Sequence, residues 1–157
     1  MLAECHDRIR RFTKLAEWLA RASDKPEREI RENAESVLRY FTIALPRHSA
    51  DEDESIAPRL LALPVPDEIR VAVGTMTRQH VTIEDTLAQL VPAWRDLVAE
   101  PGSLVDRALT MERDVEQLQR LWDTHLFLEE TIVFPAARAL LPAAVHEEIL
   151  REMRARR

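Results

Sequence analysis

One pattern occurs twice in this chain of 157 residues: a histidine, a glutamate four residues later, and a proline six residues after that. The two copies, His-x3-Glu-x5-Pro, run from His48 to Pro58 and from His125 to Pro135. Residues four apart share one face of an α-helix, so each copy places an imidazole beside a carboxylate. Both pairs fall in phase with an apolar stripe, where the side chains would be buried. Because buried imidazoles and carboxylates are costly unless they are paired or bind a metal, the pattern predicts a metal site between helices.

The composition limits the fold and the class of protein. Two glycines, few β-branched runs and abundant Leu, Ala, Arg and Glu favour an all-α fold, and the length suits one domain spanning residues 1–157. The net charge of −6, with acidic and basic residues interspersed, offers no basic face to nucleic acid. The single cysteine, Cys5, excludes an internal disulfide and fits a reducing compartment. No apolar stretch predicts a membrane span or a signal peptide, so we expect a cytoplasmic protein.

Turn residues divide the chain into helices. Breaks in helical periodicity fall at Ser23–Pro26, Leu63–Asp67, Glu100–Ser103 and Pro142. The helices predicted between them cover residues 2–21, 27–62, 67–99, 104–141 and 143–156. Because short connections make neighbouring helices antiparallel, we expect an up-down four-helix bundle with a short C-terminal fifth helix.

Two further histidines belong with the repeated pairs. His80 lies in the apolar stripe of the helix predicted over 67–99, and His6 borders the stripe of the first helix. Along antiparallel helices rising ~1.5 Å per residue, the histidines of the second, third and fourth helices come to one level. The candidate metal ligands are His6, His48, Glu52, His80, His125 and Glu129. Glu84, four residues after His80, is a further ligand, a carboxylate that orients an imidazole, or a solvated side chain.

Other polar residues near the motifs receive simpler interpretations. Asp51, Asp53 and Glu54 flank Glu52 and are expected to form a solvated acidic face, of which one member could line an ion entry path. The prolines of the two motifs predict helix kinks that could shape the floor of the site. Pro46 has no functional interpretation, and His146 is expected at the surface.

The chain resembles the hemerythrin-like family, also called HHE cation-binding domains. The segments that resemble the family are Cys5–Ile9, Leu45–Glu52 with Pro58, Gln79–His80, His125–Glu130 with Phe134–Pro135, and Glu152–Arg157. The resemblance implies a non-haem di-iron centre bridged by Glu52 and Glu129. His6, His48, His80 and His125 would be the terminal ligands.

The third helix departs from the pattern of the oxygen-carrying hemerythrins. Those proteins have two histidines one turn apart, whereas here Glu84 follows His80 and Met76 precedes it by four residues. Six protein ligands would leave two iron ions open positions for water, an oxo or hydroxo bridge, or a small ligand. Mixed imidazole and carboxylate ligands also suit other divalent metals.

We therefore expect a di-iron protein that binds or processes small oxidants, with dioxygen, nitric oxide or peroxide as its partner. An enzyme that consumes peroxide or nitric oxide fits the same site. The alternative is an iron sensor or store, in which metal occupancy controls folding or partner binding. The sequence leaves the oligomeric state open.

Overall fold

The computed structural model describes the backbone of residues 2–157 and the side chains of residues 4–157. The described chain is helical and contains no strand, which confirms the all-α prediction. Its contacts divide it into two units. Unit 1 comprises Met1–Leu45 and Thr82–Trp122, and unit 2 comprises Pro46–Val81 and Asp123–Arg157. Two long helices, α5 (Asp67–Ala99) and α6 (Leu104–Leu128), contribute residues to both units, and a single domain over residues 1–157 stays a prediction.

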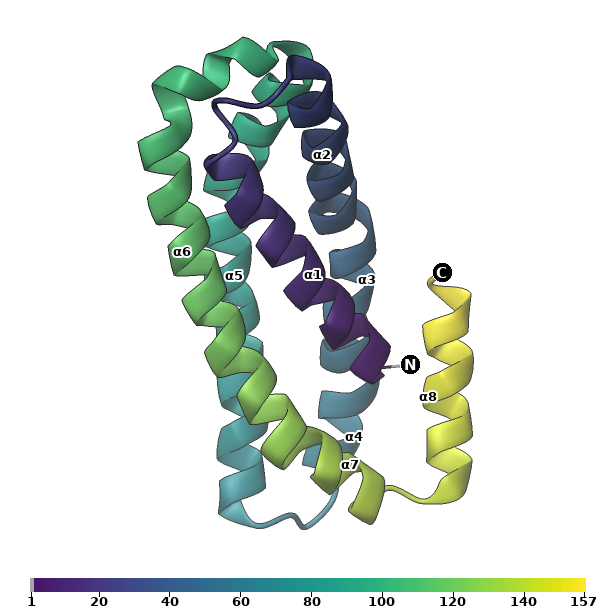
Figure 1. Cartoon of the computed structure of the whole chain (residues 1–157). Helices are drawn as coiled ribbons and strands as arrows, with labels where there is room; N and C mark the ends of the chain where they lie inside the picture. The colour runs from purple at the N-terminus through teal and green to yellow at the C-terminus, as the bar shows by residue number, and fades with distance from the viewer. Residues whose placement is uncertain (1) are drawn as a thin grey trace. The chain divides into compact units, whose positions relative to one another are not determined.

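Unit 1 contains α1 (Leu2–Ala20), α2 (Glu27–Arg39), the π-helical segment η1 (Tyr40–Ala44) and the 3₁₀ turn η3 (Pro101–Ser103). Helix α1 packs against α2 (Figure 1). Aromatic rings fill this unit's core: Phe12 stacks on Tyr40 with the ring centroids 4.1 Å apart, and Phe41 stacks on Trp94 at 5.3 Å. Such pairs stabilise a core beyond the apolar area that they bury.

Unit 2 is built from shorter helical stretches. They are α3 (Leu45–Ala50), η2 (Asp51–Ile56), α4 (Ala57–Leu61), η4 (Glu129–Val133), α7 (Phe134–Leu140) and α8 (Ala143–Ala155). Helix α8 packs against η2, and α4 meets α7 (Figure 1). The core of this unit is apolar, with Ile56, Leu60, Val73 and Val133 at most 2% exposed.

Each π-helical segment ends two residues before a proline. Segments η1, η2 and η4 end at Ala44, Ile56 and Val133, and Pro46, Pro58 and Pro135 follow. Proline has no N–H to donate, and its ring collides with the carbonyl four residues earlier, so a widened turn relieves the helix just before it. A proline alone does not impose this turn, because Pro92 lies inside α5 without one. The kinks expected in the two motifs are thus π turns, and Pro46 acquires the same structural role.

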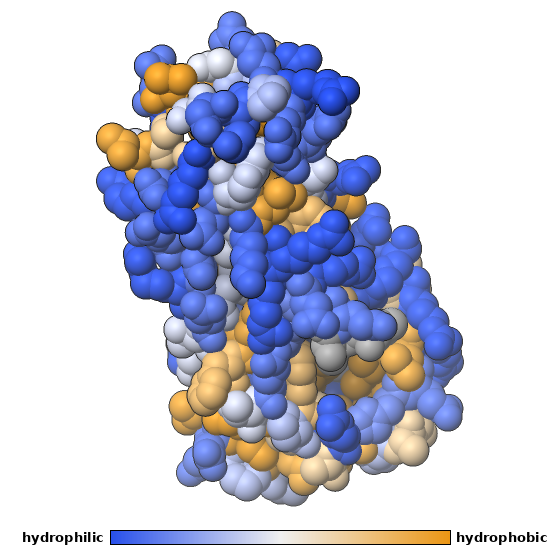
Figure 2. Space-filling model, viewed as in Figure 1, coloured by the Kyte–Doolittle hydropathy of each residue, from blue (hydrophilic) through white to orange (hydrophobic). Residues whose placement is uncertain are grey.

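None of the described helices is both long and apolar enough to cross a membrane. Hydrophilic residues cover most of the face seen in Figure 2.

Candidate metal centre

Five of the six predicted ligands lie in unit 2, on three separate stretches of helix. His48 and Glu52 come from α3 and η2, His80 from α5, and His125 and Glu129 from α6 and η4. None of the five is more than 3% exposed. Two of the three π-helical segments, η2 and η4, each include one of the two glutamates, and the proline of the motif follows each of them by two residues.

The carboxylate of Glu52 faces two histidines with its two oxygens. Oε1 lies 3.3 Å from Nε2 of His48, and Oε2 lies 3.3 Å from Nε2 of His80. These contacts are long for hydrogen bonds, and among the described side chains neither oxygen has a donor of good geometry. The Glu52 carboxylate therefore offers one oxygen beside each of these imidazoles, where a cation could be shared.

Glu129 lies opposite, on η4. Its Oε1 is 3.0 Å from Nε2 of His125 and 3.9 Å from Nε2 of His80. The imidazole rings of these two histidines have centroids 4.7 Å apart and are tilted by 59°. Ligand atoms of Glu52, His80, His125 and Glu129 all lie within 4.8 Å of one another. Unit 2 thus brings together two imidazoles and two carboxylates that could hold one cation.

The far nitrogens of two imidazoles are held by neighbouring side chains. Nδ1 of His80 is 2.8 Å from Oδ2 of Asp53, whose other oxygen accepts a hydrogen bond from the hydroxyl of Thr77 at 3.2 Å. Nδ1 of His125 is 3.1 Å from the side-chain oxygen of Gln79. Because the partner of each Nδ1 is an oxygen, the imidazole carries its proton on Nδ1. The Nε2 atom, which faces the carboxylates, then keeps a lone pair that can bind a metal. This is the arrangement that orients histidine ligands in metal sites.

Burial and like charge raise the pKa of the Glu52 carboxyl well above its ordinary value of 4.5, because the carboxylate of Glu129 faces it. Burial lowers the pKa of His80, but its contacts with Asp53 and Glu52 outweigh burial and raise that pKa to about 10. In the absence of a cation, protons therefore compensate the charge of the buried carboxylates.

These residues fit a bound cation. Two carboxylates and two neutral imidazoles balance the charge of one divalent ion and offer borderline and hard donor atoms. Such a donor set suits iron, manganese or zinc. A cation would also take the place of the missing hydrogen-bond donors at the buried oxygens of Glu52.

Two predicted residues belong to unit 1. His6 is fully buried on α1, in unit 1, and its role as a ligand stays a prediction. Glu84 is exposed on α5, also in unit 1, and is not a member of the group formed by Glu52, His80, His125 and Glu129.

Sequence reasoning missed the two residues that hold the imidazoles. The expectation of a solvated acidic face was wrong for Asp51, which is fully buried, and for Asp53, which hydrogen-bonds to His80. Glu54 is exposed, as expected. Asp53 directly follows the motif's glutamate, but this position does not indicate a contact with His80. Gln79 was noted only as the neighbour of His80 in a segment that resembles the family.

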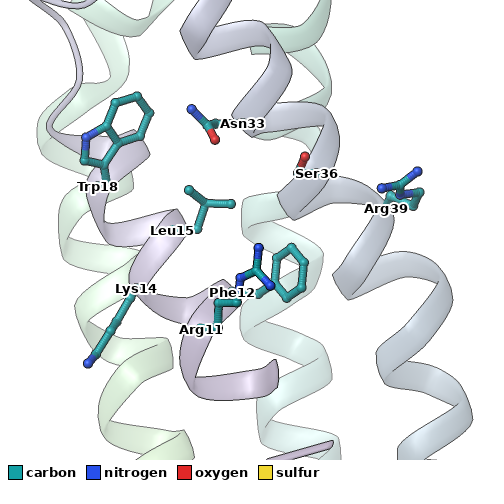
Figure 3. Close-up of a pocket in the computed structure, with 8 residues that line it drawn as sticks. All are labelled: Arg11, Phe12, Lys14, Leu15, Trp18, Asn33, Ser36 and Arg39. Atoms are coloured by element: carbon teal, nitrogen blue, oxygen red, sulfur yellow. The ribbon is translucent and has the colours of Figure 1, made fainter. Parts of the chain in front are cut away.

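Unit 1 also contains a pocket of about 520 Å³ between α1 and α2. Its lining residues are Arg11, Phe12, Lys14, Leu15, Trp18, Asn33, Ser36 and Arg39, and Figure 3 shows Lys14 and Arg39 extending away from its centre. The side chains of Asn33 and Ser36 donate to carbonyls of their own helix. With no histidine or carboxylate in its lining, the pocket offers no chemistry comparable to that of the buried cluster.

The fold and the buried cluster define a class: an all-helical protein with histidines and carboxylates placed to hold a cation. Residues 1–137 match the family model described as the hemerythrin HHE cation binding domain, and the chain belongs to this family. An uncharacterized protein of Haemophilus influenzae is 26% identical over 159 residues, an alignment that covers all of this chain and 88% of that protein.

Proposed function

We propose that this protein holds two iron ions and uses them to bind or process a small oxidant such as dioxygen, nitric oxide or peroxide. The observation that supports the proposal most strongly is the buried group of Glu52, His80, His125 and Glu129, with ligand atoms within 4.8 Å of one another. Membership of a cation-binding family supports the same conclusion.

The side chains have distinct roles in this proposal. His48, His80 and His125 would hold the metal through their imidazoles, and the carboxylates of Glu52 and Glu129 would hold it with them and balance its charge. Bound iron would supply redox chemistry and open coordination positions. Buried apolar residues of the same unit, among them Ile56 and Val133, exclude bulk water from the cluster.

The proposal includes an antiparallel, up-down four-helix bundle with α8 as a short fifth helix, in which α1 supplies His6 to the second ion. The short connections along the chain support this arrangement. A His6→Ala variant is expected to bind close to one iron per chain, because Glu52, His80, His125 and Glu129 remain. A variant that keeps two irons per chain would remove His6 from the ligand set.

Metal analysis and an anaerobic spectrum test the function. We expect about two irons per chain after expression with ample iron, and an ultraviolet–visible spectrum of the reduced protein that changes on adding dioxygen or nitric oxide. His125→Ala is the matched variant, expected to lose both metal and spectral change. Fewer than about one metal per chain in the unaltered protein would overturn the proposal. Turnover of peroxide or nitric oxide would identify an enzyme, and a stoichiometric change alone would identify a binding protein.

An iron sensor or store is the second candidate, and the burial of the ligands favours it. Burying two carboxylates and three imidazoles in unit 2 is costly without a cation, so occupancy should affect the folding of this unit. Circular dichroism with and without a chelator distinguishes the candidates, since equal helicity and equal melting temperature would argue against a folding switch.

A further inference from the structure

Helix α8 follows the last residue that the family model matches, and it makes its polar contacts with the π turn that contains Glu52. The family model ends at residue 137, whereas α8 covers Ala143–Ala155. Its buried side chains, Ile149 and Met153, attach it to unit 2, and it packs against η2. The contacts of α8 therefore come from residues beyond the range that the family model matches.

Asp51 is the centre of these contacts. It directly precedes Glu52 on η2 and is completely buried. Arg156 donates to its Oδ1 at 3.0 Å, and Arg157 donates to its Oδ2 at 2.8 Å. Each carboxylate oxygen thus has its own guanidinium, which is the strong, charge-assisted form of hydrogen bond. A carboxylate buried in this way depends on these partners, because it would be left uncompensated without them.

A second set of contacts joins α8 to Ser55, one turn further along the helix, and to Arg59 on α4. The buried hydroxyl of Ser55 donates to Glu152 at 2.5 Å and accepts from Arg156 at 2.9 Å. Arg59, on α4, forms a two-pronged pair with Glu152 and also donates to the backbone carbonyl of Ser55 at 2.9 Å. Together with the contacts of Asp51, they connect α8 to both the first and the penultimate residue of η2.

We infer that Arg156 and Arg157 are positioning residues for the metal centre: by binding Asp51 they fix the π turn that directs Glu52 at His48 and His80. A π turn is rare, and it occurs mostly as a single turn inside an α-helix, frequently at a functional site. Asp51 and Glu52 are adjacent, so their side chains leave the helix in different directions. The arginines bind the first, and the histidines face the second. The part of this inference that concerns metal binding rests on the proposed function.

The test compares Arg156→Gln/Arg157→Gln with Arg154→Gln in the full chain. Arg154 is an exposed arginine of the same helix and serves as the matched control. In the metal-free proteins, amide hydrogen exchange over residues 47–60 should become at least about tenfold faster in the double variant and stay unchanged in the control. Unchanged exchange in the double variant would overturn the inference, whether or not the protein binds iron.

The second readout uses cobalt(II) alone as the probe. The double variant should release cobalt to excess chelator about 10–100-fold faster than the unaltered protein, and its visible bands should shift because Glu52 is displaced. The Arg156→Lys/Arg157→Lys variant, which keeps both charges, should restore most of the retention. Equal release rates and identical bands would overturn the inference. If the unaltered protein binds neither cobalt nor iron, the proposed function is overturned. The hydrogen-exchange measurement then decides alone whether Arg156 and Arg157 fix the π turn.

If the double variant does not fold, the single variants Arg157→Gln and Asp51→Asn replace it. Each removes only part of the contact and should accelerate exchange over the same residues. Exchange that accelerates equally throughout unit 2 would show that the arginines stabilise the whole unit, and would overturn a specific role at η2.

Discussion

At the scale of single residues, the carboxylate that holds His80 is Asp53 and not Glu84. Both are acids close to the histidine, but Glu84 is exposed and Asp53 lies 2.8 Å from Nδ1. Sequence spacing favoured Glu84, because a separation of four residues places side chains on one helix face. Asp53 reaches His80 from another stretch of helix, and single-sequence spacing contains no information about such a contact.

Asp53→Asn should weaken metal binding about 10–100-fold, because the imidazole loses the anionic partner that fixes its orientation. Glu84→Gln removes the same charge four residues from His80 and should leave the affinity unchanged. Competition titration with a chelator measures both. Equal losses in the two variants would show that only the local charge matters.

Glu52→Gln separates metal binding from stability. We expect the variant to lose at least about a hundredfold in metal affinity. Its melting temperature without metal should equal or exceed that of the metal-free unaltered protein, because a buried carboxylate with a raised pKa is replaced by a neutral amide. Calorimetry on metal-free and metal-loaded protein measures this. A large fall in the metal-free melting temperature would contradict the account of Glu52 as a costly buried charge.

At the scale of elements, the ends of the helices were predictable from the sequence, but the π-helical segments inside them were not. The observed stretches from Glu27 to Leu61, Asp67 to Ala99 and Leu104 to Leu140 begin where predicted and end within one residue of the predictions. Proline and glycine chemistry at the turns explains this success. The π turns were missed because they change the hydrogen-bond register without interrupting the helix. The position of each proline could have indicated them, but Pro92 shows that the signal is not sufficient.

Pro135→Ala should return η4 to α-helical register and move Glu129 away from His125. Metal affinity should fall at least about tenfold, while helicity stays the same or rises because alanine favours helix. Pro92→Ala, in a helix without a π turn, is the control and should leave metal binding unchanged. Titration and circular dichroism measure the two effects. A Pro135→Ala protein with full affinity would show that the proline does not position the glutamate.

The pairing of α8 with α4 should depend on pH in the acid range. Hydrogen bonds from Arg59 and Ser55 lower the pKa of Glu152 from its ordinary value of 4.5 to about 2. Because the folded-state pKa is depressed, this contribution to stability is complete above about pH 4.5 and is lost as the pH falls toward 2. Acid titration followed by circular dichroism should show a smaller decrease in stability over this window for Glu152→Gln. The difference should be modest, since the side chain is 39% exposed and solvent screens the pair.

At the scale of the whole molecule, metal removal tests how much of the stability depends on the centre. Free metal at a hundred times its dissociation constant contributes about 2.7 kcal/mol. For a chain of this length, that corresponds to a melting temperature roughly 5–10 °C higher than in the metal-free protein. Differential scanning calorimetry before and after chelation measures the change. An identical melting temperature would indicate that the metal does not bind the folded protein in preference to the unfolded chain.

The family, and the burial of the histidines and glutamates of the two motifs, were predictable from one sequence because the motifs repeat and fall in an apolar phase. What surrounds the ligands was not predictable, because Asp53, Gln79 and Arg156 act across separate helical stretches. Asp51 illustrates the difficulty. An acidic residue among other acidic residues is expected to be exposed to solvent, and only the folded chain reveals the two arginines that bind Asp51.

The widened turns also have a consequence for how relatives of this chain should be compared. A π turn uses one residue more than an α turn before the hydrogen-bond ladder resumes. A related chain without Pro58 or Pro135 can therefore omit one residue beside its glutamate and keep the remainder of that helix in phase. Single-position gaps in an alignment are expected at η2 and η4 and not along α5, where the ladder contains no π segment.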